Sequence, residues 1–347
     1  MAPDLDDIRL EVSGWIRENW DPELSLVEWR SRLADSGWAC PSWPPEWCGR
    51  GFPAASVDVV TREIAAAGAV GVPEGVGMHL AAPTILEHGS QSVKEWFIRK
   101  TVTGEFTWCQ LFSEPGAGSD LAGLTTRADR DGEQWIVTGQ KVWNTSAGHA
   151  DFGLLLARTN WDVPKHAGIT SFAIPMHQAG VEVRPLRQMN GHASFNEVFL
   201  DEARVPADHV IGAVDGGWRA ALTTLAHERR LAPVGRGGAA VPARPGRAWR
   251  EAAEELARVA APYTWYPQRA GRVDLVVPRA VATGRVSDPL VRQEIARLVS
   301  LSWASRWTAQ RVAAARALGR PPGPEGSIAK LASSRIARAA SGAHGMI

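Results

Sequence analysis

Apolar residues recur at intervals of three and four from Leu5 to about Thr103, and this spacing predicts helices along most of the segment. Ile8, Val12 and Ile16 give an example near the start of the chain. Side chains at this spacing line one face of a helix, which can then pack against its neighbours. We therefore expect an N-terminal all-α domain over residues 1–106.

The stretch Pro41–Gly51 interrupts this pattern with prolines and glycines. It cannot form a regular helix or a central strand, because proline lacks the amide donor and glycine loosens the backbone. Trp43 and Trp47 lie inside it. We therefore expect these two side chains to pack from a loop.

Over residues 107–213 the apolar period changes to two, and β-rich runs are separated by Gly, Asp and Pro. The clearest predicted hairpin joins Leu124–Arg130 to Gln134–Val142 through Asp131-Gly132, a dipeptide that tolerates positive φ in a tight turn. No helical pattern intervenes, so we expect an antiparallel sheet or barrel as the middle domain. The other predicted strands are Thr107–Phe112, Gly153–Arg158, Thr170–Ile174, Val181–Pro185 and Asn196–Leu200.

Helical spacing returns after Gly216-Gly217, and we expect a C-terminal helical domain with a short tail over residues 214–347. Its strongest helix runs from Asp288 to about Leu318, where Ser287 or Asp288 can cap it and Pro289 suits the first turn. The remaining expected features are a helix over Trp218–Leu231, a connection over Pro233–Arg247 and a last helix from near Pro324.

An apolar stripe at spacing four lies on the long helix, at Ile295, Val299, Trp303 and Trp307, and it indicates a face packed against other helices. The complete order is all-α, all-β, all-α. The sequence therefore predicts a multidomain α+β protein with an N-terminal helical domain, a middle antiparallel β-barrel or sheet, and a C-terminal α-helical bundle.

The composition is that of an ordinary globular protein, with 45% hydrophobic and 22% charged residues. Lys and Arg number 38 against 37 Asp and Glu, so nothing indicates a nucleic-acid or anionic-membrane partner. No apolar run reaches the ~20 residues that a membrane span needs, and we expect none. Three cysteines without a Cys-x-x-Cys pair indicate a reduced compartment, with the cytoplasm as the default. We assign no metal site.

The first candidate chemistry is the segment Ser113–Asp120, which follows a predicted strand. Gly116 and Gly118 would let backbone N–H groups approach an anion or a flat ligand, and Ser113 and Ser119 supply hydroxyls. The segment lacks the third glycine and the βαβ setting of a dinucleotide fold, and it lacks the Gly-Lys-Ser/Thr of a P-loop. Taken alone, its spacing favours an ordinary glycine turn.

The second candidate is Gly139–Gly148, at the end of the second hairpin strand. Trp is unusually frequent in this chain, with 16 residues against 2 Tyr and 8 Phe. Trp143 offers a large aromatic face, and Thr145 offers a hydroxyl on the same side of an extended chain. The alternative is that Trp143 is an ordinary core residue.

Together these two segments resemble the flavin-binding signature of the acyl-CoA dehydrogenase family. The resemblance covers residues 5 to about 232 and resumes at Pro324–Leu331, and the predicted α, β, α order agrees with the fold of that family. Further stretches that carry it are Trp43–Glu46, Arg184–Met189, Asn196–Leu200, Ala203–Pro206 and Gly216–Trp218.

The resemblance implies α,β-dehydrogenation of an acyl-CoA thioester, in which FAD accepts a hydride at flavin N5 from Cβ and a carboxylate removes the α-proton. It also implies a role in fatty acid or lipid catabolism, with an electron-transferring flavoprotein or a similar protein as acceptor. Gly118 and Ser119 match positions that contact FAD phosphate or the CoA, so Ser119 is also a substrate candidate. The other implied cofactor contacts are Gln110, Leu111, Phe112 and Ser113 at the strand end, and Trp143, Asn144 and Thr145 at the ring.

The base that removes the α-proton comes, in this family, from a late loop or from the first C-terminal helix. Glu228 falls at the helix position, and the late loop would lie after Ile347, so Glu228 is the one mapped candidate if the chain is complete. Arg229 matches a position near the thioester and is implied to contact substrate. The alternatives are that Glu228 is a solvated residue paired with Arg229 or Arg230, and that Arg229 only balances charge.

One departure from the family concerns the cofactor's pyrophosphate. Members continue from this helix into an Arg-x-x-Phe-Gly segment that reaches the pyrophosphate across a dimer interface, and no such segment occurs between Val234 and Val286. We expect a homo-oligomer or a hetero-oligomer, as a dimer or tetramer. The alternative function is a non-catalytic or half-site subunit that completes a heteromeric acyl-CoA dehydrogenase. A flavin oxidase also remains open.

Overall fold

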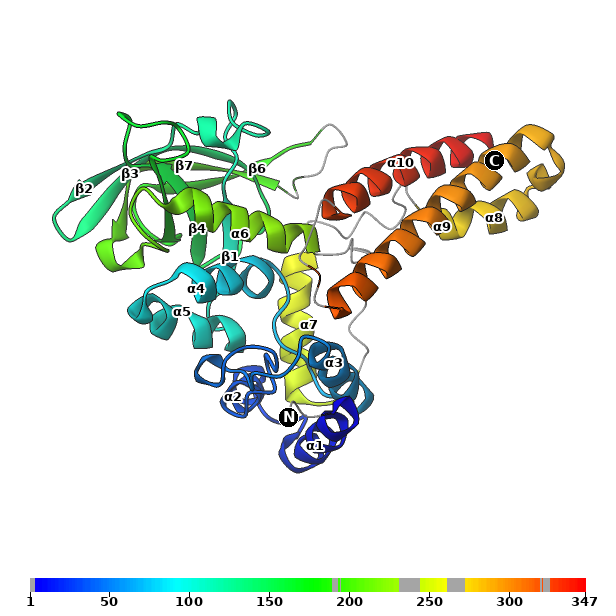
Figure 1. Cartoon of the computed structure of the whole chain (residues 1–347), viewed down its shortest axis with the longest axis horizontal. Helices are drawn as coiled ribbons and strands as arrows, with labels where there is room; N and C mark the ends of the chain where they lie inside the picture. Colours follow the sequence, from blue (N-terminus) through cyan, green and yellow to red (C-terminus); the bar gives the residue numbers. More distant parts are fainter. Residues whose placement is uncertain are drawn as a thin grey trace. The chain divides into compact units, whose positions relative to one another are not determined.

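The computed structural model describes residues 4–188, 193, 195–230, 244–260, 272–318, 320 and 325–347. These residues form two compact units (Figure 1). One contains the chain up to Glu228 together with helix α7, and the other contains the helices from α8 onward. The two units do not correspond one to one with the three predicted domains. The limits 1–106, 107–213 and 214–347 therefore stay predictions.

The first part of the larger unit is helical, as predicted. Ile8, Val12 and Ile16 of α1 are buried together with Trp29 and Leu33 of α2, which explains the spacing of three and four in the sequence. The helices are α1 (Leu5–Asn19), α2 (Leu26–Asp35), α3 (Ser56–Ala66), α4 (Ala82–His88), which follows a π-helical turn at Gly77–Ala81, and α5 (Gln91–Thr103).

The Pro41–Gly51 stretch forms a loop with one 3₁₀ turn, Pro45–Trp47. Trp43 and Trp47 are partly buried and pack from it against the core between helices and sheet. The prediction of tryptophans that anchor a loop is confirmed.

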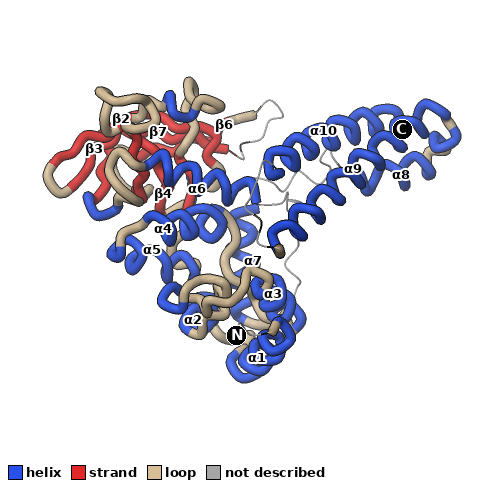
Figure 2. Tube along the Cα trace, viewed as in Figure 1, coloured by secondary structure: helices blue, strands red, loops and turns tan. Residues whose placement is uncertain are grey.

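A seven-stranded sheet follows, in the order β1-β4-β2-β3-β7-β6, with β5 paired to β4 (Figure 2). Most neighbours are antiparallel, as predicted, but β1 runs parallel to β4, and so does β2 at one residue pair. The prediction of an antiparallel sheet is wrong for these pairs, because apolar alternation marks the faces of a strand and not its direction. The strands are β1 (Trp108–Leu111), β2 (Arg127–Asp131), β3 (Gln134–Asn144), β4 (Phe152–Arg158), β5 (Ile169–Pro175), β6 (Val181–Leu186) and β7 (Phe195–Pro206).

Strand β4 separates two hydrophobic cores. Leu154 and Leu156 pack with α4, α5 and α6 (Gly217–Arg230), whereas Leu155 and Ala157 pack among the strands. All seven residues of β4 are buried, which explains why its first six residues, Phe152 to Ala157, are a continuous apolar run before Arg158. Helix α6 therefore lies on the same core as the end of β1, whose neighbour Phe112 belongs to it.

Helix α7 (Arg247–Ala260) returns to the N-terminal helices and packs against α2. A Glu251 carboxylate oxygen accepts the backbone N–H of Leu26 at 2.7 Å, which satisfies a free donor in the first turn of α2. Arg30 is almost fully buried and forms a bidentate ion pair with Glu255. Its Nη1 and Nη2 donate to Oε2 and Oε1 of Glu255 at 2.6 and 3.0 Å, respectively. These contacts join segments that are far apart in the sequence.

The smaller unit contains α8 (Val273–Ala282), α9 (Pro289–Ala317) and α10 (Glu325–Met346), so the predicted long helix and last helix are confirmed. Its core includes Leu298 of α9. The prediction that Trp303 and Trp307 lie on a packed face is wrong, because both are exposed. Trp303 and Trp307 follow the buried Leu298 by five and nine residues, which at about 100° per residue places them roughly 140° and 180° away from it around the helix.

No helix in the described ranges is long and apolar enough to cross a membrane.

Candidate cofactor and substrate site

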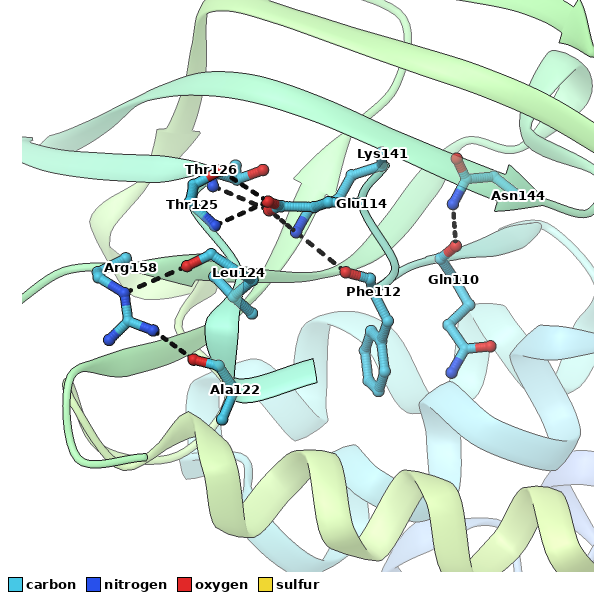
Figure 3. Close-up of polar contacts among 10 residues, drawn as sticks. All are labelled: Gln110, Phe112, Glu114, Ala122, Leu124, Thr125, Thr126, Lys141, Asn144 and Arg158. Atoms are coloured by element: carbon cyan, nitrogen blue, oxygen red, sulfur yellow. Dashed lines mark hydrogen bonds and ion pairs between the residues drawn. The ribbon is translucent and has the colours of Figure 1, made fainter. Parts of the chain in front are cut away.

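The two segments singled out in the sequence lie side by side where β1 and β3 end (Figure 3). The backbone N–H of Val142 donates to the carbonyl of Ser113 at 2.9 Å. The side-chain amide of Asn144 donates to the carbonyl of Gln110 at 2.7 Å. The structure therefore brings the predicted strand-end residues next to the predicted ring residues.

The strand-end side chains alternate between two environments. Gln110 is half-buried, and Figure 3 shows its side chain directed to the same side as that of Phe112. The side chain of Leu111 is fully buried among the strands, so it could contact a cofactor only through its backbone. Asn144 is buried as well, and its Oδ1 makes no hydrogen bond within the described part of the chain.

Trp143 is the exposed aromatic residue of this site. Trp143 is 57% exposed. Its ring packs edge-on against the ring of Phe195, with the two ring centroids 5.8 Å apart. Its φ is +64°, and the register with β7 shifts between Lys141 and Asn144. The extended conformation that would place Trp143 and Thr145 on one side is therefore wrong at this position: Trp143 sits in a bulge, and Thr145 in the turn that follows.

The segment after Ser113 is a tight turn closed by two backbone hydrogen bonds between Glu114 and Ala117. Gly118 and Ser119 are exposed. Neither Gly116 nor Gly118 has a positive φ, and an added Cβ at either would meet no heavy atom of the described residues within 4 Å. Steric demands of this described part of the chain therefore do not explain the two glycines. Their open backbone fits the close approach of a ligand.

Beneath this turn, Glu114 and Lys141 form a buried ion pair at 2.9 Å. Glu114 also accepts the N–H and hydroxyl of Thr125 at 2.7 and 2.9 Å, and the N–H of Thr126 at 2.8 Å. Lys141 Nζ donates in addition to the carbonyl of Phe112 at 3.2 Å. We call these four contacts of Glu114, with the Lys141–Phe112 bond, the Glu114–Lys141 clasp.

The clasp sets the ionisation of both groups. Burial acts to raise the pKa of Glu114, but the Lys141 ammonium and the hydrogen bonds outweigh it and lower the pKa to about 2. Burial lowers the pKa of Lys141 to about 8 despite the opposing effect of Glu114. Both groups are therefore charged near neutral pH.

Sequence reasoning missed this pair. Trp135, Val137, Gly139 and Lys141 alternate along β3, and the first two are buried core residues. Because every second residue of a strand points to the same face, this alternation alone would have placed Lys141 on the buried face. A buried lysine requires a partner of opposite charge, and the structure supplies it from Glu114.

Glu228 and Arg229 lie on the last turn of α6, and both are exposed. Glu228 follows Thr224 by four residues and Leu225 by three, so it continues the face of α6 that packs on the core containing Phe112. The structure places Glu228 beyond the end of that buried face. The structure brings the two candidate segments, Ser113–Asp120 and Gly139–Gly148, together, whereas Glu228 and Arg229 are placed only on the exposed end of α6.

The structure combines an N-terminal helical part with a sheet, and an exposed indole and an open glycine turn lie at the edge of that sheet. Residues 8–105 match the acyl-CoA dehydrogenase N-terminal domain, and residues 109–203 match the acyl-CoA dehydrogenase middle domain. The chain belongs to the acyl-CoA dehydrogenase family.

Comparison with individual proteins agrees. Acyl-CoA dehydrogenase FadE34 of Mycobacterium tuberculosis is 42% identical over 298 residues, which are 85% of this chain and 37% of FadE34. This chain thus spans well under half the length of that relative. Among solved structures, a variant of the steroid ACAD Tcur3481-Tcur3483 aligns with 25% identity and a TM-score of 0.65, covering 98% of this chain and 85% of that one. The ChsE4-ChsE5 complex of Mycobacterium tuberculosis aligns with 25% identity and a TM-score of 0.62, covering 99% and 85%.

Proposed function

We propose that this chain carries out the FAD-dependent α,β-dehydrogenation of an acyl-CoA thioester. The observation that carries the proposal is the exposed indole of Trp143 beside the end of β1, next to a turn whose glycines leave the backbone open. A flat apolar face and open backbone N–H groups suit the ring and the phosphates of FAD, respectively. When bound, FAD supplies the acceptor for the hydride that leaves Cβ.

The residues of the chain hold and orient the reactants. Trp143 gives the flavin ring an aromatic surface, with Asn144 and Thr145 beside it. Gln110, Leu111, Phe112 and Ser113 are assigned to the ring edge, the buried Leu111 through its backbone only. Gly118 and Ser119 are assigned to the phosphates of FAD or CoA. These residues would hold the ring, and the apolar core to which Phe112 belongs would exclude water beside it.

Glu228 is assigned as the base. The α-proton of a thioester is weakly acidic, so a carboxylate must be positioned beside it while the developing charge on the thioester oxygen is stabilised. The proton passes to the Glu228 carboxylate as the hydride leaves Cβ, which forms the Cα–Cβ double bond. Arg229, next along the chain, is assigned to the CoA side of the substrate.

Anaerobic bleaching tests this assignment. The purified protein should be yellow with about one FAD per chain, and an acyl-CoA substrate should bleach it. Glu228→Gln should keep the flavin and lose the bleaching, whereas Glu18→Gln, at the matching exposed position near the end of α1, should change neither. Bleaching of the Glu228 variant at the native rate would refute the base.

The substrate and acceptor belong to the same proposal. The structural relative Tcur3481-Tcur3483 is a steroid ACAD, which favours including steroid-derived acyl-CoAs beside straight and branched chains in the bleaching panel. An electron-transferring flavoprotein or similar cytoplasmic protein is the expected acceptor. Slow reoxidation of the reduced protein by air would support a dehydrogenase, and rapid reoxidation an oxidase.

A second candidate is a non-catalytic or half-site subunit of a heteromeric acyl-CoA dehydrogenase. The missing Arg-x-x-Phe-Gly segment favours it, and one structural relative is described as a complex of two differently named chains. Protein purified alone would then lack flavin, and co-expression with an acyl-CoA dehydrogenase homologue would restore both flavin and activity. Full flavin content and bleaching in the isolated chain would eliminate this candidate.

A further inference from the structure

The Glu114–Lys141 clasp is buried beneath the proposed cofactor site, with the two side chains 0% (Lys141) and 5% (Glu114) exposed. Removing two charges from water is costly, and a well-packed apolar pair of the same size is often at least as stable. Stability therefore does not explain why the chain buries this pair. An ion pair does what an apolar pair cannot: its hydrogen bonds fix the direction and spacing of the backbone groups that it contacts.

The clasp closes the loop that carries the proposed phosphate contacts. Glu114 stands at the start of this loop and binds Thr125 and Thr126 at its end. Arg158 holds the same end, donating to the carbonyls of Ala122 at 2.7 Å and Leu124 at 3.3 Å (Figure 3). The base of the loop is fixed in this way, while Gly118 and Ser119 stay exposed.

The same lysine also holds the ring side of the site. Lys141 Nζ bridges the carbonyl of Phe112 and the carboxylate of Glu114. One buried ammonium thus connects the backbone assigned to the ring edge with the loop assigned to the phosphates. A ligand that spans both must match the distance between them, and this distance is set by the clasp.

We propose that Glu114 and Lys141 are positioning residues, which set the spacing between the ring-side segment Gln110–Ser113 and the phosphate-side residues Gly118 and Ser119. The inference rests on the proposed function, because it requires FAD at this site. Pre-set spacing lowers the ordering cost of binding, so the clasp acts on flavin affinity and on the environment of the ring.

The diagnostic variant is Glu114→Gln combined with Lys141→Met. It removes both charges together, so neither ion remains buried without a partner. Apoprotein is titrated with FAD, and the absorption spectrum of the bound flavin and the urea midpoint of the apoprotein are measured. We expect at least a tenfold weaker FAD affinity and a shifted or broadened visible band, with the urea midpoint close to that of the wild type.

Leu33→Ala is the control, because Leu33 is fully buried among the N-terminal helices and belongs to a different core. It should lower the urea midpoint and leave FAD affinity within twofold. Native-like FAD affinity and spectrum in the double variant would overturn the inference, as would equal loss of FAD in the Leu33 variant. FAD binding that depends on the clasp, without bleaching by any acyl-CoA, would support the inference and refute the proposed activity. A wild-type protein that takes up no FAD would overturn both.

Discussion

Trp143→Ala tests the part of the site that the structure defines best. Among the residues that the structure describes, this indole has one ring contact, edge-on to Phe195, and 57% of Trp143 is exposed. Truncation should therefore change the unfolding free energy by no more than about 0.5–1 kcal/mol. Any larger effect on flavin binding then comes from the lost surface and not from unfolding.

The expected loss of affinity follows from the exposed area. A Trp side chain offers ~200 Å², of which 57% is open, and a flat ring covers about half of that, or ~60 Å². At about 25 cal/mol per Å² this contributes ~1.5 kcal/mol, and aromatic stacking adds ~0.5–1.5 kcal/mol. The total of about 2–3 kcal/mol corresponds to a Kd for FAD raised about 30- to 150-fold.

The assay is titration of apoprotein with FAD, followed by the quenching of flavin fluorescence. Trp96→Ala is the matched control, because Trp96 is 50% exposed and lies on α5, outside the site. Its truncation should leave the Kd within threefold. An unchanged Kd for the Trp143 variant, or equal weakening by both variants, would refute the assignment of Trp143 to the flavin.

Three further predictions concern buried ionisable groups. The pKa of Glu114 is about 2, below its ordinary 4.5, so its contribution to stability is lost as the pH falls from 4.5 toward 2; urea midpoints over this range should fall more steeply in the wild type than in Glu114→Gln. Glu255→Ala leaves Arg30 buried without its carboxylate and should lower the unfolding free energy by about 3 kcal/mol in urea titrations, unlike Glu254→Ala. Complete burial raises the pKa of Cys109 to about 12, so it should not react with Ellman's reagent at pH 8 until the protein is unfolded.

Local elements were the most predictable part of the fold. Spacing of three and four located α1 and the long α9, and the hairpin was placed within a residue of its turn, where Gly132 takes a φ of +58°. The parallel pairing of β1 with β4 was not predictable, because it depends on which strands meet in space. The packing of α7 against α2 was not predictable either, because the local sequence pattern of Arg247–Ala260 does not indicate which helix it packs against.

The candidate site was predictable as two motifs but not as a geometry. Resemblance located Ser113–Asp120 and Gly139–Gly148, and the structure places them together. The left-handed conformation of Trp143 escaped prediction, because a bulge depends on the register with β7. The clasp was missed because Glu and Lys are residue types of the surface, although the alternation along β3 indicates a buried position for Lys141.

The docking of α7 on α2 also constrains the order in which the chain can fold. Leu26 and Arg30 bind Glu251 and Glu255, which follow 225 residues later. Contacts of such sequence separation form late, since the intervening chain must first be confined. During synthesis, the N-terminal helices therefore emerge with Arg30 unpaired and one face uncovered, and they complete their packing only after the whole sheet has been made. A fragment that stops before α7 should be aggregation-prone even though it contains every strand.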